Sequence, residues 1–349
     1  MQSLIEIQQQ LLPDLLVVMR KRYLILRQVM LSESIGRRSL AASLDMTERV
    51  LRAETDFLKS QELLIIDAAG MRISDSGKRL IEEMEPLYKI MFGLSELEER
   101  IRKYYGLKQV VIVAGDSENS LHSKRELGRA GCAVLRKVMG KDDVVAVTGG
   151  STIAQVANQL TSQTPLKGNW FVPARGGLGE SLDYQANTIA STMAKRTGAQ
   201  YRMLHVPDHL GEEAYTSLMQ EPNVREIVEV IRKARIVIHG IGDAMVMARR
   251  RRVDATVIEA MKAEGALAES FGYYFDRKGA VVHKMLTAGL RLEDIMETEV
   301  VIAIAGGQDK AEAIAAVMRF GHDDVLVTDE AAAMELAAIM DKEQGSNPT

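Results

Sequence analysis

Hydrophobic positions along the chain follow two different spacings. Up to about residue 104 they recur every three to four residues, with one short exception, as in amphipathic helices. From Gln109 onward, short β-branched runs alternate with helix-length amphipathic stretches. This alternation favours βαβ units and a parallel sheet covered by helices on both faces. The change of spacing predicts a domain boundary near Gly106.

Seven apolar runs are the expected strands of this sheet: 110–113, 144–147, 170–172, 201–206, 236–238, 300–305 and 325–327. Two more runs, 273–275 and 280–283, flank Asp276-Arg-Lys-Gly279 and predict an inserted hairpin near a sheet edge. The predicted fold class is therefore α/β, with a doubly wound, mostly parallel sheet preceded by a small helical domain.

Residues 36–62 predict a helix-turn-helix. A short helix with Leu40, Ala41 and Leu44 is followed by a second helix that begins at Thr47, a favourable N-cap residue. The inward face of the second helix is expected to carry Val50, Leu51, Ala53 and Leu58. The side chains expected to face the DNA major groove are Thr47, Glu48, Arg49, Arg52 and Thr55.

A small β-wing is expected next, because strand-like runs 63–66 and 71–73 flank Asp67-Ala-Ala-Gly70. Residues 1–78 are thus predicted to be a winged helix-turn-helix domain that binds operator DNA. Arg49 and Arg52 are candidates for guanine edges or for phosphates, and the sequence leaves both open. The predicted contacts to the DNA backbone are Arg37, Arg38 and Arg72.

The alternative to a DNA-binding domain is a small helical packing module, and the local charge distinguishes the two. The chain carries a net charge of −4, yet residues 20–79 contain twelve Lys and Arg against eight Asp and Glu. A basic region within an acidic chain favours DNA as the partner.

Residues 79–105 carry a heptad-like apolar stripe and predict a linker and dimerisation helix. The alternative is a helix that packs on its own domain, because Pro86 and Gly93 disturb a long regular helix. Palindromic operators call for two-fold protein symmetry, which favours a homodimer or homotetramer.

The larger domain, residues 106–342, is expected to bind an effector molecule and to oligomerise. A phosphate-binding loop is predicted within it. The strand 143–148 leads directly into a helix through Gly149, Gly150, Ser151 and Thr152. Glycines let the backbone approach a ligand, and a helix N-terminus offers unpaired N–H groups. No lysine of a Walker motif and no GxGxxG pattern follows, so ATP, NAD and other cofactors are not expected.

Three further loops follow predicted strands, and parallel strands bring such loops to one edge of the sheet. They contain Arg175-Gly-Gly177, Gly240-Ile-Gly242-Asp243 and Gly306-Gly-Gln-Asp-Lys310. Arg175 and Lys310 are expected to close on a phosphate, so that replacing either by Ala weakens binding of the phosphorylated ligand and leaves folding intact.

Two further candidates for the pocket have simpler alternatives. From the run 249–252, Arg250 is the candidate to reach the ligand, whereas a charge run is usually a solvated face. Glu269 is a candidate acceptor for sugar hydroxyls, with a helix-end salt bridge as the alternative.

Several other functions are disfavoured. His205 and His209 have no third ligand nearby, so no metal site is expected. The only cysteine, Cys132, lies in an apolar helical pattern and predicts a buried thiol in a reducing cytoplasm. No secretion signal and no run of twenty apolar residues is present, so no membrane association is expected.

Extended patterns in the larger domain resemble the SorC family of sugar-responsive transcriptional repressors. They are Thr148-Gly-Gly-Ser-Thr152, Gly272-Tyr-Tyr-Phe-Asp-Arg-Lys-Gly279, Ile304-Ala-Gly-Gly-Gln-Asp-Lys-Ala-Glu-Ala-Ile314 and Val325-Leu-Val-Thr-Asp-Glu-Ala-Ala332. In order, they cover residues from about 105 to 340.

The resemblance implies an effector domain similar to sugar-phosphate isomerases and glucosamine-6-phosphate deaminases. It also implies dimers or tetramers on DNA, control of central glycolytic genes, and repression relieved by fructose 1,6-bisphosphate. By position it points to these ligand contacts: Gly149 to Thr152, Arg175, Gln185, Arg250, Glu269 and Lys310.

The main rival is an active sugar-phosphate isomerase or deaminase with an added helical domain. The deaminases follow Gly-Ile-Gly with Asp-Gly-His, whereas Asp243 is followed here by Ala244 and Met245. The imidazole for proton transfer is missing, so no enzyme is expected and Asp243 is interpreted as structural or as a hydroxyl acceptor. A DNA-binding structural protein without effector is disfavoured by the predicted pocket.

Overall fold

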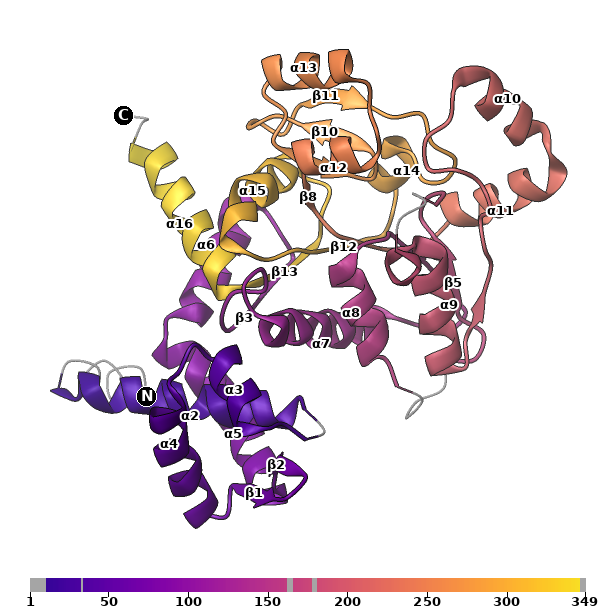
Figure 1. The fold of residues 1–349 in the computed structure, drawn as a ribbon. Coiled ribbons are helices and arrows are strands. Elements are labelled where there is room, and N and C mark those ends of the chain that lie inside the picture. Colours follow the sequence, from indigo (N-terminus) through magenta and orange to yellow (C-terminus); the bar gives the residue numbers. More distant parts are fainter. Residues whose placement is uncertain (1–10, 33, 162–165, 178–180, 346–349) are drawn as a thin grey trace. The chain divides into compact units, whose positions relative to one another are not determined.

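The computed structural model describes residues 11–32, 34–161, 166–177 and 181–345 (Figure 1). The chain divides into two compact units. The first comprises residues 1–97 with 120–122, and the second comprises 98–119 with 123–349. Each unit is described separately below.

The first unit is a winged helix-turn-helix. Its helices are α2 (Pro13–Met30), α3 (Arg37–Ser43), α4 (Glu48–Ser60) and α5 (Asp75–Met91), and its wing is β1 (Leu64–Asp67) paired antiparallel with β2 (Gly70–Ile73). Gly70, at the turn, has φ +123, and a Cβ there would lie 2.5 Å from Ser34 Oγ. A larger residue would therefore strain the wing and collide with the segment before α3.

The core of this unit fixes the direction of α4. Leu51 and Leu58 of α4 are buried together with Leu40 of α3. Tyr23 of α2 stacks on Tyr88 of α5 with ring centroids 4.3 Å apart. Thr47 caps α4 by accepting a hydrogen bond from the Val50 backbone N–H. Because the apolar face is anchored, the opposite face of the helix remains at the surface.

The region 79–105 forms two helices and not the single helix expected from its heptad-like pattern. α5 ends at Met91, and α6 (Leu94–Tyr105) begins after Gly93, which has φ +70. A left-handed glycine ends a helix without steric cost. Pro86 lies inside α5, which continues past it. The expected role of this region in dimerisation stays a prediction.

The second unit is built on a seven-stranded parallel sheet, in agreement with the predicted α/β class. Its strands are β3 (Gln109–Val113), β4 (Val144–Val147), β5 (Trp170–Pro173), β6 (Gln200–Tyr201), β7 (Ile236–His239), β12 (Val300–Ile304) and β13 (Val325–Asp329). The strand order is β3-β13-β12-β7-β4-β5-β6. All seven expected strands are present, although the run 201–206 contributes only its first residue, to β6.

Two buried clusters cover the two faces of this sheet, as a doubly wound fold requires. Along β4, Val145 and Val147 belong to one cluster and Ala146 to the other, because successive side chains of a strand alternate between faces. The first cluster includes buried residues of α7 (Leu121–Val138), α8 (Ser151–Gln159) and α9 (Ala186–Thr197). Cys132 of α7 is one of them, as expected. The second cluster includes α11 (Pro222–Arg232).

The predicted hairpin belongs to a separate antiparallel sheet of four strands. It consists of β8 (Gly242–Asp243), β9 (Ala268–Ser270), β10 (Tyr273–Phe275) and β11 (Val281–Lys284), in the order β11-β10-β9-β8. With α12 (Ala244–Arg250) and α13 (Ala255–Ala263) it forms the orange part of Figure 1. The remaining elements are η1 (Leu182–Tyr184), α10 (Glu212–Gln220), α14 (Leu292–Met296), η2 (Gln308–Lys310), α15 (Ala311–Phe320) and α16 (Glu330–Gly345).

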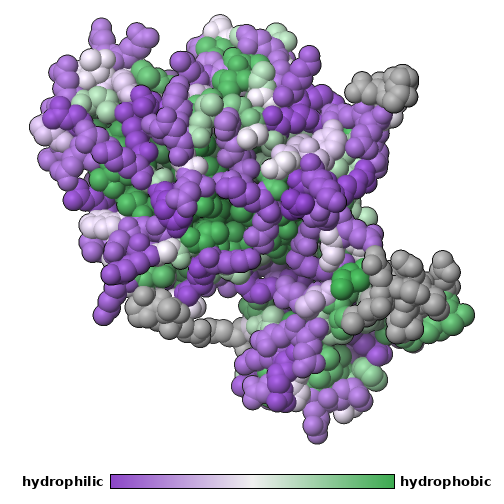
Figure 2. Space-filling model, turned by 180° about the vertical axis from the view of Figure 1, so that it is seen from behind, coloured by the Kyte–Doolittle hydropathy of each residue, from purple (hydrophilic) through white to green (hydrophobic). Residues whose placement is uncertain are grey.

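Hydrophilic residues cover most of the face seen in Figure 2, with hydrophobic residues gathered in patches between them. The large hydrophobic side chains exposed in the first unit include Leu11, which precedes α2, and Leu15 and Val17 in its first turns. Among the described residues, none of the helices is both long and apolar enough to cross a membrane.

Candidate effector site and DNA-binding surface

Sheet topology brings the predicted ligand loops to one edge. The connection from β4 leads to β5 on one side, whereas the chain from β7 passes to β12 on the other side. The strand order therefore reverses between β4 and β7, and open α/β sheets bind ligands at the carboxyl ends of the strands at such a point. The loops after β4 and β7 are those of Gly149-Gly150 and Gly240-Ile-Gly242.

The loop after β4 is held firmly at the N-terminus of α8. Gly150, with φ +115, is the N-cap residue, and its N–H donates to the Tyr184 carbonyl over 2.9 Å. The first intrahelical bond runs from the Ala154 N–H to the Gly150 carbonyl. The preceding amides of Ser151 and Thr152 therefore have no intrahelical acceptor, which suits them to an anion.

We expect Gly149→Ala to disturb this loop. A Cβ at Gly149 would lie 2.6 Å from the Tyr184 carbonyl oxygen, so the backbone has to shift. The expected cost is about 1 to 3 kcal/mol of unfolding free energy, with weaker phosphate binding. Gly211→Ala is the matched control, since Gly211 has φ −71 and a Cβ added there would meet no atom within 4 Å. Urea unfolding and calorimetry with inorganic phosphate measure both effects, and equal behaviour of the two variants would contradict the prediction.

Arg175 lies in a buried charge cluster with Asp208, Arg251 and Glu269. Its Nε is 2.9 Å from Asp208 Oδ1, and its Nη1 donates to Glu269 Oε1 over 3.3 Å. Arg251 Nη2 is 2.9 Å from the same Glu269 oxygen, which also accepts the Gly272 N–H over 2.6 Å. The four side chains are between 4% and 6% exposed. Two cations thus balance two carboxylates away from water.

Not every polar atom of this cluster is satisfied. Within the described residues, Arg175 Nη2 and Asp208 Oδ2 have no hydrogen-bond partner. Burial, with Arg251 beside it, lowers the pKa of Arg175, although a guanidinium remains charged in proteins. A buried guanidinium with a spare donor is suited to bind an anionic oxygen.

From the run 249–252, the structure turns Arg251 inward, whereas Arg250 is exposed at the end of α12. Asp208 and Arg251 were missed by sequence reasoning. The charge run did signal that one arginine could point inward, but Asp208 carries no such signal. Glu269 lies in strand β9 and joins both arginines, so its alternative role in a helix-end salt bridge is not what the structure shows.

Gln185 and Lys310 complete the set of predicted ligand residues. Gln185 is the N-cap residue of α9, and its Oε1 lies close to Gly177. Lys310 Nζ donates to Glu118 Oε2 over 2.8 Å, in the loop after β3. This hydrogen bond holds the pKa of the Glu118 carboxyl below its usual value.

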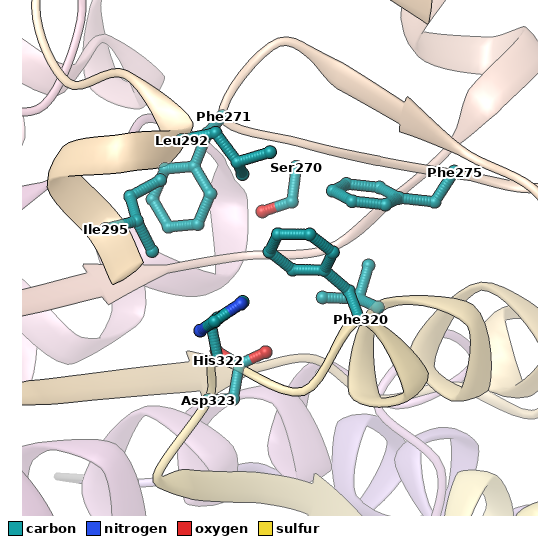
Figure 3. Close-up of a pocket in the computed structure, with 9 residues that line it drawn as sticks. Ser270, Phe271, Phe275, Leu292, Ile295, Phe320, His322 and Asp323 are labelled. Atoms are coloured by element: carbon teal, nitrogen blue, oxygen red, sulfur yellow. The ribbon is translucent and has the colours of Figure 1, made fainter. Parts of the chain in front are cut away.

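Two cavities elsewhere do not suit a sugar phosphate. The cavity in Figure 3, where Phe271, Phe275 and Phe320 surround Ser270, has a volume of about 10 Å³, which is room for one water. A larger one, of about 340 Å³ between α13 and β11, is lined by Glu264 and His283 and has no arginine or lysine. The loops at the carboxyl edge of the main sheet remain the candidate effector site.

A Ser-His-Asp arrangement lies beside the small cavity. His239 Nδ1 is 2.8 Å from Ser270 Oγ, and His239 Nε2 is 2.6 Å from Asp323 Oδ1. His239 is 0% and Ser270 1% exposed, so no substrate reaches the hydroxyl. We interpret these bonds as structural, joining β7 to β9 and to the segment before β13. Asp243 is structural as well, since it caps α12 by accepting the Val246 N–H.

The candidate DNA-binding surface is the start of α4. Thr47, Glu48, Arg49 and Arg52 are exposed as predicted. The prediction for Thr55 is wrong, because this residue is 0% exposed and its hydroxyl donates to the Leu51 carbonyl one turn earlier. Of the residues expected to face inward, Val50 and Ala53 are exposed.

The three arginines predicted to contact the DNA backbone differ in their ion pairs and in their exposure. Arg38 pairs with Glu48 over 3.3 Å, and Arg72 pairs with Asp67 across the wing. Arg37 is half-buried at the start of α3. Among the described residues Arg49 and Arg52 make no ion pair, which leaves both available for bases or phosphates.

Comparison with known proteins identifies both units. A family model of the CggR N-terminal DNA binding domain matches residues 18–88, and a model of a sugar-binding domain matches residues 89–338. The crystal structure of a SorC family transcriptional regulator from Enterococcus faecalis matches with a TM-score of 0.65 and 41% identity, covering 69% of this chain and 99% of that one. The chain belongs to the SorC family of transcriptional regulators.

Two relatives match nearly the whole chain. The central glycolytic genes regulator of Priestia megaterium is 48% identical over 337 residues, covering 96% of this chain and 98% of the relative. That of Bacillus subtilis is 45% identical over 336 residues, covering 96% and 99%. The chain therefore has a DNA-binding domain and a sugar-binding domain, and it is a transcriptional regulator and not an enzyme.

Proposed function

We propose that this SorC family member represses genes of central glycolysis and that a phosphorylated sugar, fructose 1,6-bisphosphate, relieves its binding to operator DNA. The proposal draws on the names of the two full-length relatives. The observation that carries it is the convergence of the Gly149-Gly150 loop and the buried Arg175 cluster on the carboxyl side of one parallel sheet.

The chemistry of this site favours a bisphosphate. A helix N-terminus contributes only about 0.3 to 2 kcal/mol to anion binding, so cationic side chains are needed as well. Arg175, Arg250, Arg251 and Lys310 provide them, while Gln185 and Glu269 offer groups for sugar hydroxyls. In a sugar bisphosphate, the two phosphates would bind the cationic side chains and the sugar hydroxyls would bind Gln185 and Glu269.

The decisive experiment is a gel shift on the DNA upstream of the chain's own gene, with and without a panel of sugar phosphates. We expect specific binding that fructose 1,6-bisphosphate weakens and that glucose and fructose do not affect. Calorimetry that shows no heat with any sugar phosphate, together with no thermal shift, would overturn the effector assignment. Turnover of fructose or glucosamine phosphates would overturn the non-enzymatic function.

We propose that Arg52 reads a base within the operator. Arg52→Ala is expected to reduce the preference for operator over random DNA by about 1 to 3 kcal/mol. Lys59→Ala is the control, since Lys59 is exposed in the last turn of the same helix. Fluorescence anisotropy with both DNAs measures the ratio, and an equal loss on both would assign Arg52 to a phosphate.

We also propose a homodimer or homotetramer, because a palindromic operator is matched by two-fold symmetry. The predicted linker region, now α5 and α6, and the exposed apolar start of α2 are the candidate contact surfaces. Light scattering with and without fructose 1,6-bisphosphate measures the assembly, and a monomer on DNA would contradict the proposal.

A further inference from the structure

Lys310, a predicted phosphate ligand, is held on the side of the sheet away from the Gly149-Gly150 loop. Lys310 follows β12, and its Nζ binds Glu118 in the loop after β3. In the strand order β3-β13-β12-β7-β4, strand β3 lies on one side of β12 and strand β4 on the other. The ammonium group is thus engaged by a carboxylate at the far side from the proposed phosphate site.

The position of Glu118 is set by its own loop. Asp116 Oδ1 accepts the Glu118 N–H over 2.9 Å, and Asp116 Oδ2 accepts the Asn119 amide over 2.8 Å. Such a turn orients the side chain of its third residue. A Cβ at Gly307 would lie 3.0 Å from Glu118 Cβ, so the two loops are in close contact.

A buried carboxylate fastens the same two loops together. Asp329 Oδ2 accepts the Ser117 N–H and the Gly307 N–H, each over 2.7 Å. Asp329 is 0% exposed. The backbones of both loops are therefore fixed at residues 117 and 307, while the Lys310 and Glu118 side chains are 28% and 44% exposed. The side-chain pair can open without moving the backbone.

We infer that Glu118 is an internal competitor of the effector, which occupies Lys310 and which an incoming phosphate must displace. This inference rests on the proposed function. In this exchange a phosphate oxygen replaces a carboxylate oxygen beside the Lys310 ammonium group. The lysine keeps its positive charge throughout. The Glu118–Lys310 pair consequently lowers the affinity for sugar phosphates and favours those with enough charge to displace a carboxylate.

The test is calorimetric titration of full-length protein with fructose 1,6-bisphosphate and with inorganic phosphate. Because a partly exposed ion pair is weak, we expect Glu118→Gln to bind fructose 1,6-bisphosphate about two- to five-fold more tightly than the parent chain. Glu312→Gln is the matched control, because Glu312 pairs with Arg277 at similar exposure and does not contact Lys310. That control is expected to bind like the parent chain.

A second variant, Lys310→Met, distinguishes competition for Lys310 from a general repulsion between Glu118 and the phosphate. In Lys310→Met, the further change Glu118→Gln is expected to give no gain in affinity. An equal gain there, or an equal gain in Glu312→Gln, would overturn the inference and leave the proposed function intact. If the parent chain binds and Glu118→Gln binds equally, the inference alone fails. If neither protein binds any sugar phosphate, both fail, whereas binding by Glu118→Gln alone supports the competitor.

Discussion

Arg175→Ala is expected to lower the unfolding free energy of the sugar-binding domain by about 3 to 5 kcal/mol, because it leaves Asp208 and Glu269 buried with one arginine between them. The sequence alone predicted a variant that binds weakly and folds normally, whereas the burial of Arg175 and its two ion pairs lead us to expect a loss of stability as well. Urea unfolding followed through the only tryptophan, Trp170 of β5, reports on this domain.

The matched control for this prediction is Arg250→Ala. Arg250 is exposed and makes no ion pair among the described residues, so its removal should change stability by no more than about 0.5 kcal/mol. Equal unfolding curves for Arg175→Ala and the parent chain would show that the buried cluster does not need its second cation.

Asp329→Ala is expected to destabilise the same domain by about 3 kcal/mol or more, because each buried N–H left without an acceptor costs about 1 to 3 kcal/mol. Three donors lose their acceptor: the amides of Ser117, Gly307 and Ala332. The loops after β3 and β12 should separate as a result. Unfolding through Trp170 fluorescence measures the loss of stability, and effector titration measures the loss of binding.

Asp309→Ala serves as the control for Asp329→Ala. Asp309 is exposed in the same loop region, within η2. A change there should stay within about 0.5 kcal/mol. If both variants unfolded alike, the Asp329 carboxylate would not be the fastening point of the two loops.

Local sequence patterns predicted the elements of this fold because their causes are local. Val145, Ala146 and Val147 are all apolar, as expected for a strand that is buried on both faces, so this run alone predicts β4. The start of α4 is likewise predicted by Thr47 alone, which is a favourable N-cap residue. Gly93 was recognised as a disturbance, and the structure shows that it ends the helix outright. Strand order needs contacts between distant segments, and no local pattern provides it.

The candidate site was predictable only in part. The glycine loop follows directly from strand and helix patterns, whereas the partners of Arg175 lie at residues 208, 251 and 269, far along the chain. Thr55 was misplaced because a threonine can satisfy its hydroxyl on the preceding turn and enter a core. The hydrophobic pattern of the sequence therefore cannot predict that such a polar residue is buried.

The pairing of β3 with β13 also determines when the sensor can be completed during synthesis. Gln109 of β3, the first strand of the seven-stranded sheet, pairs in register with Val325 of β13, its last strand along the chain, so β3 acquires its partner only after almost the whole chain has emerged. Pairings at such long range form slowly, and the winged helix-turn-helix, built from neighbouring segments, is expected to fold first. The nascent protein is therefore expected to have a folded DNA-binding domain before the Glu118 and Lys310 loops can meet.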